Sequence, residues 1–265
     1  MDIDWDTTLA AVWRPRAARL RAVRRLDSVR LDDLLGIDRQ KQALMQNIEQ
    51  FVSGRPANNV LLWGSRGTGK SSLVKALLNQ YRVRGLRIIE IDKLDLADLP
   101  EIVDNIRELA QRFLLFCDDL SFEEGETAYK HLKSVLEGSI ELPPENALIC
   151  ATSNRRHLIS ERRAENAGAE LVDGELHYGD TVEEKLSLAD RFGLWLSFYP
   201  NNTEQYLAIV DHLFTSEAHD REALHLAAKQ FAMTRASKSG RTARQFFLAW
   251  GGQLPGSGLA SHRPD

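Results

Sequence analysis

Apolar residues occur along the chain in short runs, and longer stretches with helical spacing separate these runs. Five of the runs are nearly continuous and stop at a polar or turn-forming residue, as buried strands do. They span residues 58–63, 86–91, 112–117, 146–152 and 193–199. Because such strands alternating with helices are typical of a parallel sheet covered on both faces, we expect a three-layer α/β/α domain with a five-stranded parallel sheet.

The pattern changes after Pro200, where strand-like runs give way to helical spacing alone. Thr203 is a suitable N-cap for the first of these helices, and helical spacing continues to Trp250. The end of the chain is rich in Gly, Pro and Ser, which favours disorder. We therefore predict three consecutive regions: the α/β domain at 31–200, a small helical lid domain at 201–252 and a disordered tail at 253–265.

The chain before this α/β domain contains a basic stretch that reads WRPRAARLRAVRRL. Pro15 suits the first position of a helix, and Leu20, Val23 and Leu26 would form the apolar edge of that helix. We therefore expect residues 1–30 to be a basic helical segment. Either this segment docks on its own domain or on a neighbouring subunit, which we favour, or it contacts nucleic-acid phosphates. The basic side chains concerned are Arg16, Arg19, Arg21, Arg24 and Arg25.

Composition narrows the class of protein. The 265 residues are 43% hydrophobic and carry a formal net charge of −4, so the whole molecule is not a polycation. No apolar run is long enough to span a bilayer, and the acidic start MDIDWD lacks the apolar core of a secretory signal. The only two cysteines, Cys117 and Cys150, lie in apolar runs and are expected to be reduced. A cytoplasmic protein without membrane contact is the expectation.

A phosphate-binding motif follows the first predicted strand. The stretch GSRGTGKSS satisfies G-x-x-x-x-G-K-[ST] in full and lies between a strand and a helix. Its glycines let successive backbone N–H groups point at a phosphate, and its lysine can reach the β- and γ-phosphates. We predict that this loop binds ATP through Gly64, Ser65, Arg66, Gly67, Thr68, Gly69, Lys70, Ser71 and Ser72.

Two adjacent carboxylates end the third predicted strand. In P-loop folds such an acid holds Mg²⁺ beside the phosphates, together with the hydroxyl of the loop. Asp118 and Ser71 are the predicted Mg²⁺ ligands. Asp119 is placed to orient or deprotonate the attacking water, and Glu123 or Glu124 is the alternative for that step.

With these motifs in place, residues 31–250 resemble the AAA+ superfamily of P-loop ATPases. The segment LDDLLGIDRQKQAL is similar to the part of the superfamily that precedes the P-loop, which implies that Leu35, Gly36 and Ile37 line the adenine. The stretch ATSN resembles the first sensor, so the resemblance gives Asn154 contact with the γ-phosphate and the water. The chain is most similar to a family of bacterial AAA+ ATP-binding proteins described as a domain of unknown function.

Two arginines acquire roles from the same resemblance. LADRFGLWLSFYP resembles the finger segment of the bacterial Holliday-junction motor, which implies that Arg191 enters the site of a neighbouring subunit. SGRTARQF is similar to the second sensor, with Arg241 as the phosphate contact and Arg244 as the alternative. A finger supplied by a neighbour implies a homo-oligomer, either a ring, for example a hexamer, or a spiral.

The expected activity is Mg²⁺-dependent binding and slow hydrolysis of ATP. Most of the superfamily has Glu where this chain has Asp119, and the bacterial replication initiators, which hydrolyse ATP slowly, share the Asp-Asp pair. A role on nucleic acid is open, and so are a nucleotide-dependent switch or adaptor and a protein remodeller. The stretch DKLDLADLPEI lacks the aromatic pore residue of threading machines, which disfavours the remodeller.

One long stretch remains without an assigned role. Residues 155–185 separate the sensor from the finger and carry many charges. Asp173-Gly174 is a typical hairpin turn, and short runs that could pair flank it. A partner surface and a disordered loop are both open for this insertion.

Overall fold

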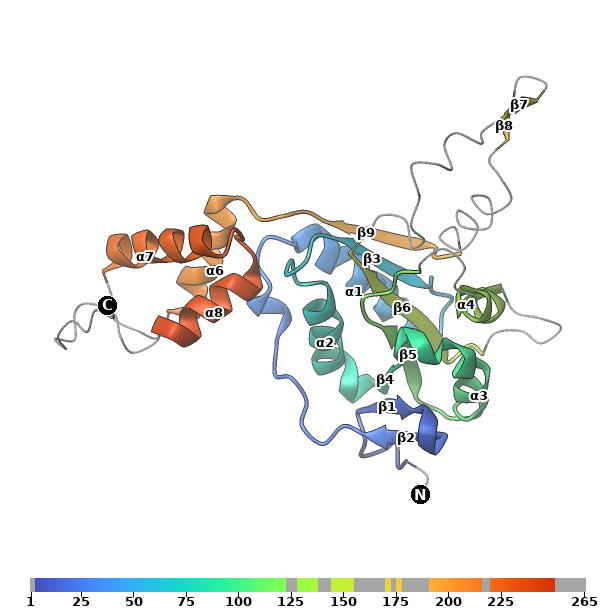
Figure 1. The fold of residues 1–265 in the computed structure, drawn as a ribbon. Helices are drawn as coiled ribbons and strands as arrows, with labels where there is room; N and C mark the ends of the chain where they lie inside the picture. The colour runs from blue at the N-terminus through green and yellow to red at the C-terminus, as the bar shows by residue number, and fades with distance from the viewer. Residues whose placement is uncertain are drawn as a thin grey trace.

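The computed structural model describes residues 3–122, 128–137, 144–154, 170–172, 175–177, 191–215 and 220–250. Figure 1 shows two parts, a sheet with helices on both sides and a cluster of three helices beside it. Among the described residues, no helix is long and apolar enough to cross a membrane.

The main sheet has seven strands in the order β2-β1-β4-β5-β6-β3-β9. The five predicted strands are present and pair parallel to one another: β3 (Val60–Gly64), β4 (Leu86–Glu90), β5 (Arg112–Cys117), β6 (Ala147–Ser153) and β9 (Leu194–Phe198). The predicted number of five was wrong, because β1 (Ala10–Arg14) pairs parallel to β4 and β2 (Arg19–Ala22) pairs antiparallel to β1.

Helices cover both faces of this sheet, which confirms the three-layer α/β/α architecture (Figure 1). The strand β5 shows the reason, because its successive side chains enter two different cores. Phe113 and Leu115 join the core under α3 (Leu99–Asp104) and α4 (Ala128–Glu137). Leu114 joins the core under α1 and α2. These two helices span Asp38–Val52 and Lys70–Tyr81.

The N-terminal basic stretch forms a hairpin, and the predicted helix was wrong. A 3₁₀ turn, η1 (Pro15–Ala17), joins β1 to β2, and Ala18 after it has φ +41°. Residues 19–22 alternate Arg-Leu-Arg-Ala, and their exposure alternates in the same way, which is the period of a strand. A distant contact fixes the hairpin further, since the indole Nε1 of Trp13 donates to Asp98 Oδ2 at 2.7 Å.

Three further 3₁₀ helices connect the elements of the α/β part. They are η2 (Leu31–Asp33), η3 (Arg82–Arg84) and η4 (Lys93–Asp98). The predicted hairpin in the insertion is present as an antiparallel pair, β7 (Glu170–Val172) with β8 (Glu175–His177). Its Asp173-Gly174 turn lies outside the described residues.

The helical part comprises α6 (Thr203–Leu213), α7 (Arg221–Thr234) and α8 (Gly240–Trp250). It has a core of its own, in which Phe214 and Phe246 are fully buried. The cap of α6 is Asn202 and not Thr203, because the Asn202 side chain accepts from the Gln205 amide at 2.8 Å. Gln205 in turn accepts from the Asn202 amide, which completes a capping box.

The two cysteines lie in the middle of the sheet. Cys117 and Cys150 are free thiols and are fully buried. Burial raises the pKa of Cys117 to about 12, and that of Cys150 is raised for the same reason. Both thiols are therefore unreactive core residues.

Candidate nucleotide-binding site

The loop between β3 and α2 is held in a shape that only glycine allows at three positions. Gly64, Gly67 and Gly69 have φ values of +131°, +74° and +97°. A Cβ on Gly64 would lie 2.0 Å from the carbonyl oxygen of Phe198, in the neighbouring strand β9. Positive φ at these glycines is typical of loops whose successive N–H groups point at a bound anion, so the loop is a candidate anion nest.

The helix α2 adds its N-terminus to this nest. Gly69 is its N-cap, no side chain caps its first N–H groups, and its first turn contains no acidic residue. These N–H groups therefore face the loop with the positive end of the helix dipole. Such an arrangement favours a bound phosphate.

Lys70 is the central cation of the site and is only 6% exposed. Its Nζ donates to the carbonyl oxygens of Gly64 and Ser65, both at 2.8 Å, and to Asn154 Oδ1 at 3.1 Å. Burial lowers the pKa of Lys70, while the neighbouring carboxylates of Asp118 and Asp119 raise it. An anionic phosphate would exchange one of the neutral acceptors for a charged one, which is the stronger partner.

Asp118 lies at the end of β5, and the register of the sheet determines its neighbours. Cys117 pairs with Ala151, so the next residues, Asp118 and Thr152, also lie side by side. Thr152 Oγ1 and Ser71 Oγ each donate to Asp118 Oδ1 at 2.6 Å. The predicted partners Ser71 and Asp118 therefore meet, and Thr152 is a neighbour that the sequence analysis missed.

Asp119 has a strained backbone, with φ +53°, and its amide donates to Thr152 Oγ1 at 2.9 Å. Asn154 Nδ2 donates to its Oδ1, and an Arg66 nitrogen lies 3.9 Å from its Oδ2. The predicted catalytic acid and the predicted sensor are thus in direct contact. Glu123 and Glu124 lie outside the described residues.

A cavity of about 890 Å³ lies over this network. Most of the predicted loop residues line it, namely Arg66, Gly67, Thr68, Gly69, Lys70, Ser71 and Ser72, together with Asp118, Asp119 and Asn154. Gly64 and Ser65 contribute through the carbonyl groups that accept from Lys70. The cavity is large enough for a nucleotide.

One part of the cavity wall is apolar and comes from two distant segments. Leu35 and Ile37, which are predicted to line the adenine, lie in this part, and so do Ile209 and Leu213 of α6. Gly36 is not among the lining residues, and its φ of +77° turns the chain between its two neighbours. An apolar surface beside a phosphate-binding loop suits a planar base.

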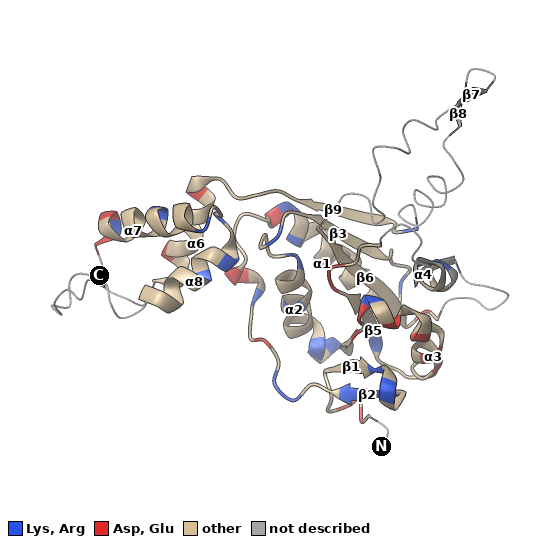
Figure 2. Cartoon of the chain, in the orientation of Figure 1, with Lys and Arg blue, Asp and Glu red and all other residues tan. Residues whose placement is uncertain are grey.

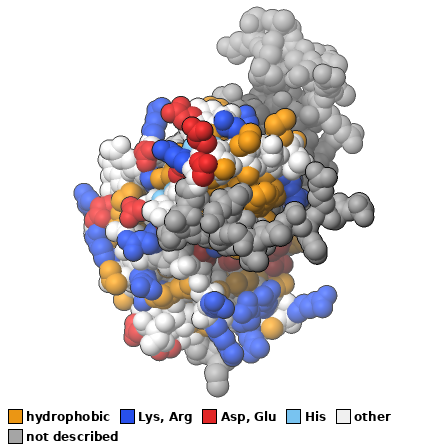
Figure 3. Space-filling model, turned by 90° about the vertical axis from the view of Figure 1, so that its left-hand side faces the viewer, with side chains coloured by type: hydrophobic (Ala, Val, Ile, Leu, Met, Phe, Trp, Pro, Cys, Tyr) orange, Lys and Arg blue, Asp and Glu red, His pale blue; other side chains and the backbone are white. Residues whose placement is uncertain are grey.

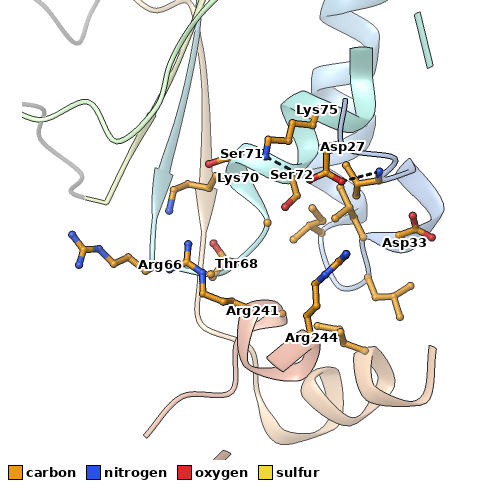
Figure 4. Close-up of a pocket in the computed structure, with 18 of the residues that line it drawn as sticks. Asp27, Asp33, Arg66, Thr68, Lys70, Ser71, Ser72, Lys75, Arg241 and Arg244 are labelled. Atoms are coloured by element: carbon orange, nitrogen blue, oxygen red, sulfur yellow. Dashed lines mark hydrogen bonds and ion pairs between the residues drawn. The ribbon is translucent and has the colours of Figure 1, made fainter. Parts of the chain in front are cut away.

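Polar residues of the same wall were not predicted. Lys75 Nζ lies 3.5 Å from Asp27 Oδ2 (Figure 4). His212 Nε2 lies 3.4 Å from Asp33 Oδ1. All four residues line the cavity. No motif identifies these four residues. The helix α1 separates residues 27–33 from the P-loop, so only the fold brings Asp27 and Asp33 to the site.

The helical part touches the P-loop directly. The Gly240 amide donates to the carbonyl oxygen of Gly67 at 3.1 Å, and a Cβ on Gly67 would lie 2.7 Å from the Ser239 side chain. Arg241 and Arg244 follow at the start of α8 and line the cavity. Arg241 extends toward the loop beside Thr68, and Arg244 extends toward the side of Asp27 and Asp33 (Figure 4). Both candidates for the second sensor therefore line the cavity, and Arg241 is the one beside the loop.

Arg191 occupies a different position. It lies just before β9 and is not among the described residues that line the cavity. Of the four residues predicted to be catalytic, Asp119, Asn154 and Arg241 line the cavity of the chain, and Arg191 does not.

The oxygen donors of the site fit Mg²⁺. Asp118 is exposed toward the cavity, and the Ser71 hydroxyl is bonded to it. Mg²⁺ is held in proteins by one or two carboxylates together with phosphate oxygens and water, and dedicated protein cages are rare. In the part of the chain that the structure describes, no group of three or more His, Cys, Asp and Glu side chains forms such a cage.

Comparisons with known proteins show the family of the chain. A family model described as "Protein of unknown function (DUF815)" matches residues 6–254. The chain is 28% identical over 160 residues to a 26S proteasome regulatory subunit 6B homolog of Encephalitozoon cuniculi, which is 50% of this chain and 41% of that protein. It is 36% identical over 67 residues to the replication factor C large subunit of Staphylothermus marinus, which is 25% of this chain and 15% of that protein. The chain therefore matches less than half the length of these curated relatives.

Solved structures share the fold. A proline-to-glycine mutant of Thermotoga maritima RuvB superimposes with a TM-score of 0.53 at 15% identity, over 85% of this chain and 74% of that one. A threonine-to-valine mutant of the same protein gives a TM-score of 0.50 at 14% identity, over 83% and 72% of the two chains. At this identity the likeness is one of fold alone.

Proposed function

The chain belongs to the DUF815 family and is an AAA+ P-loop protein, and on this premise we propose that it hydrolyses ATP in a Mg²⁺-dependent reaction at a site completed by a neighbouring subunit. One observation carries the proposal. The nest of residues 64–70, the Asp118–Ser71 pair and the Lys70–Asn154–Asp119 network all border one cavity.

The residues divide the work according to their charge. The loop amides and Lys70 would hold the β- and γ-phosphates, and Asp118 with Ser71 would hold Mg²⁺, which offsets the negative charge of the phosphates. Thr152 is a positioning residue, because it donates to Asp118 and accepts from the Asp119 amide. Asn154 and Asp119 would orient the attacking water.

Cations complete the site from two sides. Arg241 and Arg244 line the cavity from the lid, and Arg66 lies at the loop itself. Arg191 is not at the cavity of its own chain, which supports a finger that acts in a neighbouring subunit's site. A homo-oligomer follows from this assignment, since a finger in trans needs a second copy.

A slow, switch-like turnover is part of the proposal. The Asp119 carboxylate accepts from Asn154 and lies near Arg66, so both of its oxygens already have partners. A water would have to compete with these groups, and the shorter Asp side chain leaves little reach. These contacts favour long-lived ATP binding over rapid turnover.

The test is ATP hydrolysis by mixtures of two variants. Arg191→Ala retains the loop and loses the finger, while Asp118→Asn retains the finger and loses the metal carboxylate. Each variant alone should be inactive, and an equimolar mixture should regain activity, because a site between the two kinds of subunit has every part. A specific rate that rises with protein concentration in the unmodified chain is the companion result.

Two outcomes would contradict the proposal. Full activity of Arg191→Ala would show that Arg191 is not a finger. A mixture as inactive as its components would show that the site is not shared between subunits. A protein that binds ATP tightly but releases no phosphate at any concentration would instead be a nucleotide-dependent switch.

A further inference from the structure

The hairpin β1–β2 lies at the edge of the sheet, remote in the strand order from the P-loop strand β3. Figure 2 shows basic residues along β2 and the turn next to it, and Figure 3 shows basic side chains gathered at the same end of the molecule. We propose that this hairpin is a binding surface for the phosphate backbone of a nucleic-acid duplex. The residues that form this surface, here called the arginine face, are Arg14, Arg16, Arg19 and Arg21.

The register of the hairpin puts three of these arginines on one side. Arg14 pairs with Arg19, and Val12 pairs with Arg21. Residues directly opposite each other in an antiparallel pair share a face, so Arg14, Arg19 and Arg21 all point outward. Leu20 points inward and packs against the core of the sheet. The hairpin thus has an apolar side toward the protein and a cationic side toward solvent.

Two arginines directly opposite each other are unfavourable by themselves. Like charges in such a cross-strand pair repel, and the pair Arg14–Arg19 has this arrangement. Within the described part of the chain, no carboxylate lies within ion-pair distance of any of the four arginines. Arg14 is near enough to Asp95 that its positive charge opposes the rise in the pKa of Asp95 that burial causes. A polyanion would relieve the repulsion that the protein leaves in place.

The local charge is not a consequence of overall composition. The whole chain has a formal net charge of −4, so the arginine face is a concentration of positive charge on an acidic protein. Arg24 and Arg25, both exposed, extend this charge beyond the end of β2. Such a face suits a ligand that repeats its negative charge at short intervals, and a duplex carries one charge per about 1.7 Å of its axis.

The chemistry of the surface favours a duplex over single strands. Proteins that bind single strands stack bases on exposed aromatic side chains. Here the aromatic residues of this region, Trp5 and Trp13, are 6% and 3% exposed and belong to the core. Arginine alone, without stacking groups, predicts contact with the backbone and little dependence on base sequence.

An edge strand with arginines has a second explanation, which the experiment must separate. Charged side chains on an edge also prevent strands of two molecules from pairing. That role needs only charge at the edge and implies no affinity for a ligand. Direct measurement of duplex binding distinguishes the two roles. This measurement does not depend on ATP hydrolysis, so its outcome is independent of the proposed function.

The experiment uses the full chain and a fluorescent duplex of about 20 base pairs, with anisotropy read between about 50 and 200 mM salt. The double variant Arg19→Gln/Arg21→Gln should bind about tenfold more weakly or worse, and its salt slope should fall by about two. The matched control, Arg39→Gln/Lys229→Gln, removes the same charge from exposed positions on α1 and α7 and should change affinity less than about twofold.

A charge-preserving variant guards against misfolding. Arg19→Lys/Arg21→Lys should retain most of the affinity, because Lys also contacts phosphates as a point charge. Absence of duplex binding by the unmodified chain would overturn the proposal, as would equal losses in the double variant and its control. Binding that a single strand shows and a duplex does not, or that poly-L-glutamate alone shows, would also overturn it and would assign the arginine face to a different partner.

Discussion

The nucleotide site and the arginine face are both charged, but they differ in how the protein partners those charges. The nucleotide site, here called the phosphate cradle, comprises residues 64–72 with Asp118, Asp119, Thr152 and Asn154. In the cradle, Lys70 has three acceptors and Asp118 has two hydroxyl donors, so each charge is fixed by the protein itself. On the arginine face, Arg14 and Arg19 oppose each other in register with no ion pair among the described residues. The first arrangement fixes geometry for chemistry, and the second leaves charge available to solvent.

This difference has a consequence for mutation. Where several groups must hold a ligand in one geometry, removing one of them lowers activity steeply, because the others no longer position the ligand correctly. A polyanion contacts many equivalent charges, so removing one of them lowers the affinity only by the share of that charge. Changes in the cradle, or in the finger that a neighbouring subunit would add to it, should therefore be large and changes on the hairpin small, and four measurements test that contrast.

The largest effect is expected for Arg191→Ala. A finger arginine contributes about 10³–10⁵ in turnover, because it stabilises the charge of the transition state. We expect kcat to fall by at least about 10³-fold while ATP affinity changes less than about threefold. Steady-state hydrolysis and equilibrium nucleotide binding, measured on the same preparation, separate the two quantities.

The control for this prediction is Arg39→Ala, which removes an exposed arginine from α1 at a position that does not line the cavity. Its turnover should remain close to that of the unmodified chain. If the two variants lose turnover equally, Arg191 has no special place in the reaction, and the contrast between the two regions weakens.

Lys70→Ala should have the next largest effect. It removes the one buried cation of the loop, and a hydrogen bond to a charged group is worth about 1.5–3 kcal/mol. ATP affinity should therefore fall by about 10–100-fold. Lys75→Ala is the matched control on the same helix, because Lys75 faces the cavity but pairs with Asp27. Similar losses in both variants would mean that the cavity binds by general charge.

Gly67→Ala tests the contact between loop and lid. Both Gly67 and Gly85 have positive φ, but a Cβ on Gly85 meets nothing within 4 Å, whereas on Gly67 it meets Ser239. Each substitution should lower the free energy of unfolding by about 1–2 kcal/mol from backbone strain. Only Gly67→Ala should also weaken ATP binding, by about tenfold, since the lid must move. Urea denaturation and nucleotide titration measure the two effects; equal affinities in both variants would show that the lid contact is irrelevant to binding.

The smallest effect is expected on the hairpin, and it has the opposite sign. Arg19→Gln removes one member of the like-charged pair with Arg14, so the free energy of unfolding should rise by about 0.2–1 kcal/mol at low salt. The gain should shrink as salt screens the repulsion. Arg25→Gln, which lies outside the paired strand, is the comparison variant. A loss of stability in Arg19→Gln would mean that the pair is stabilised by contacts other than charge.

The sequence predicted the cradle better than the hairpin because the two depend on different ranges of interaction. The P-loop motif is local, since three glycines set the backbone that the nest requires. The hairpin depends on the bond between Trp13 and Asp98, which are separated by 85 positions. Pro15 suits a helix start as well as a turn, and only pairing with β4 decides between these alternatives.

The sequence by itself determined the P-loop, the acids at the end of β5 and the alternation of strands and helices, because each depends on residues close together in the chain. The tertiary structure decided which strands are neighbours. The order β5-β6-β3 brings Asp118, Thr152 and Lys70 together, and the docking of α8 brings Arg241 to the loop. Periodicity shows which face of a strand is buried, but it carries no information about which strand lies beside it, since strands pair through backbone hydrogen bonds that almost every residue can make.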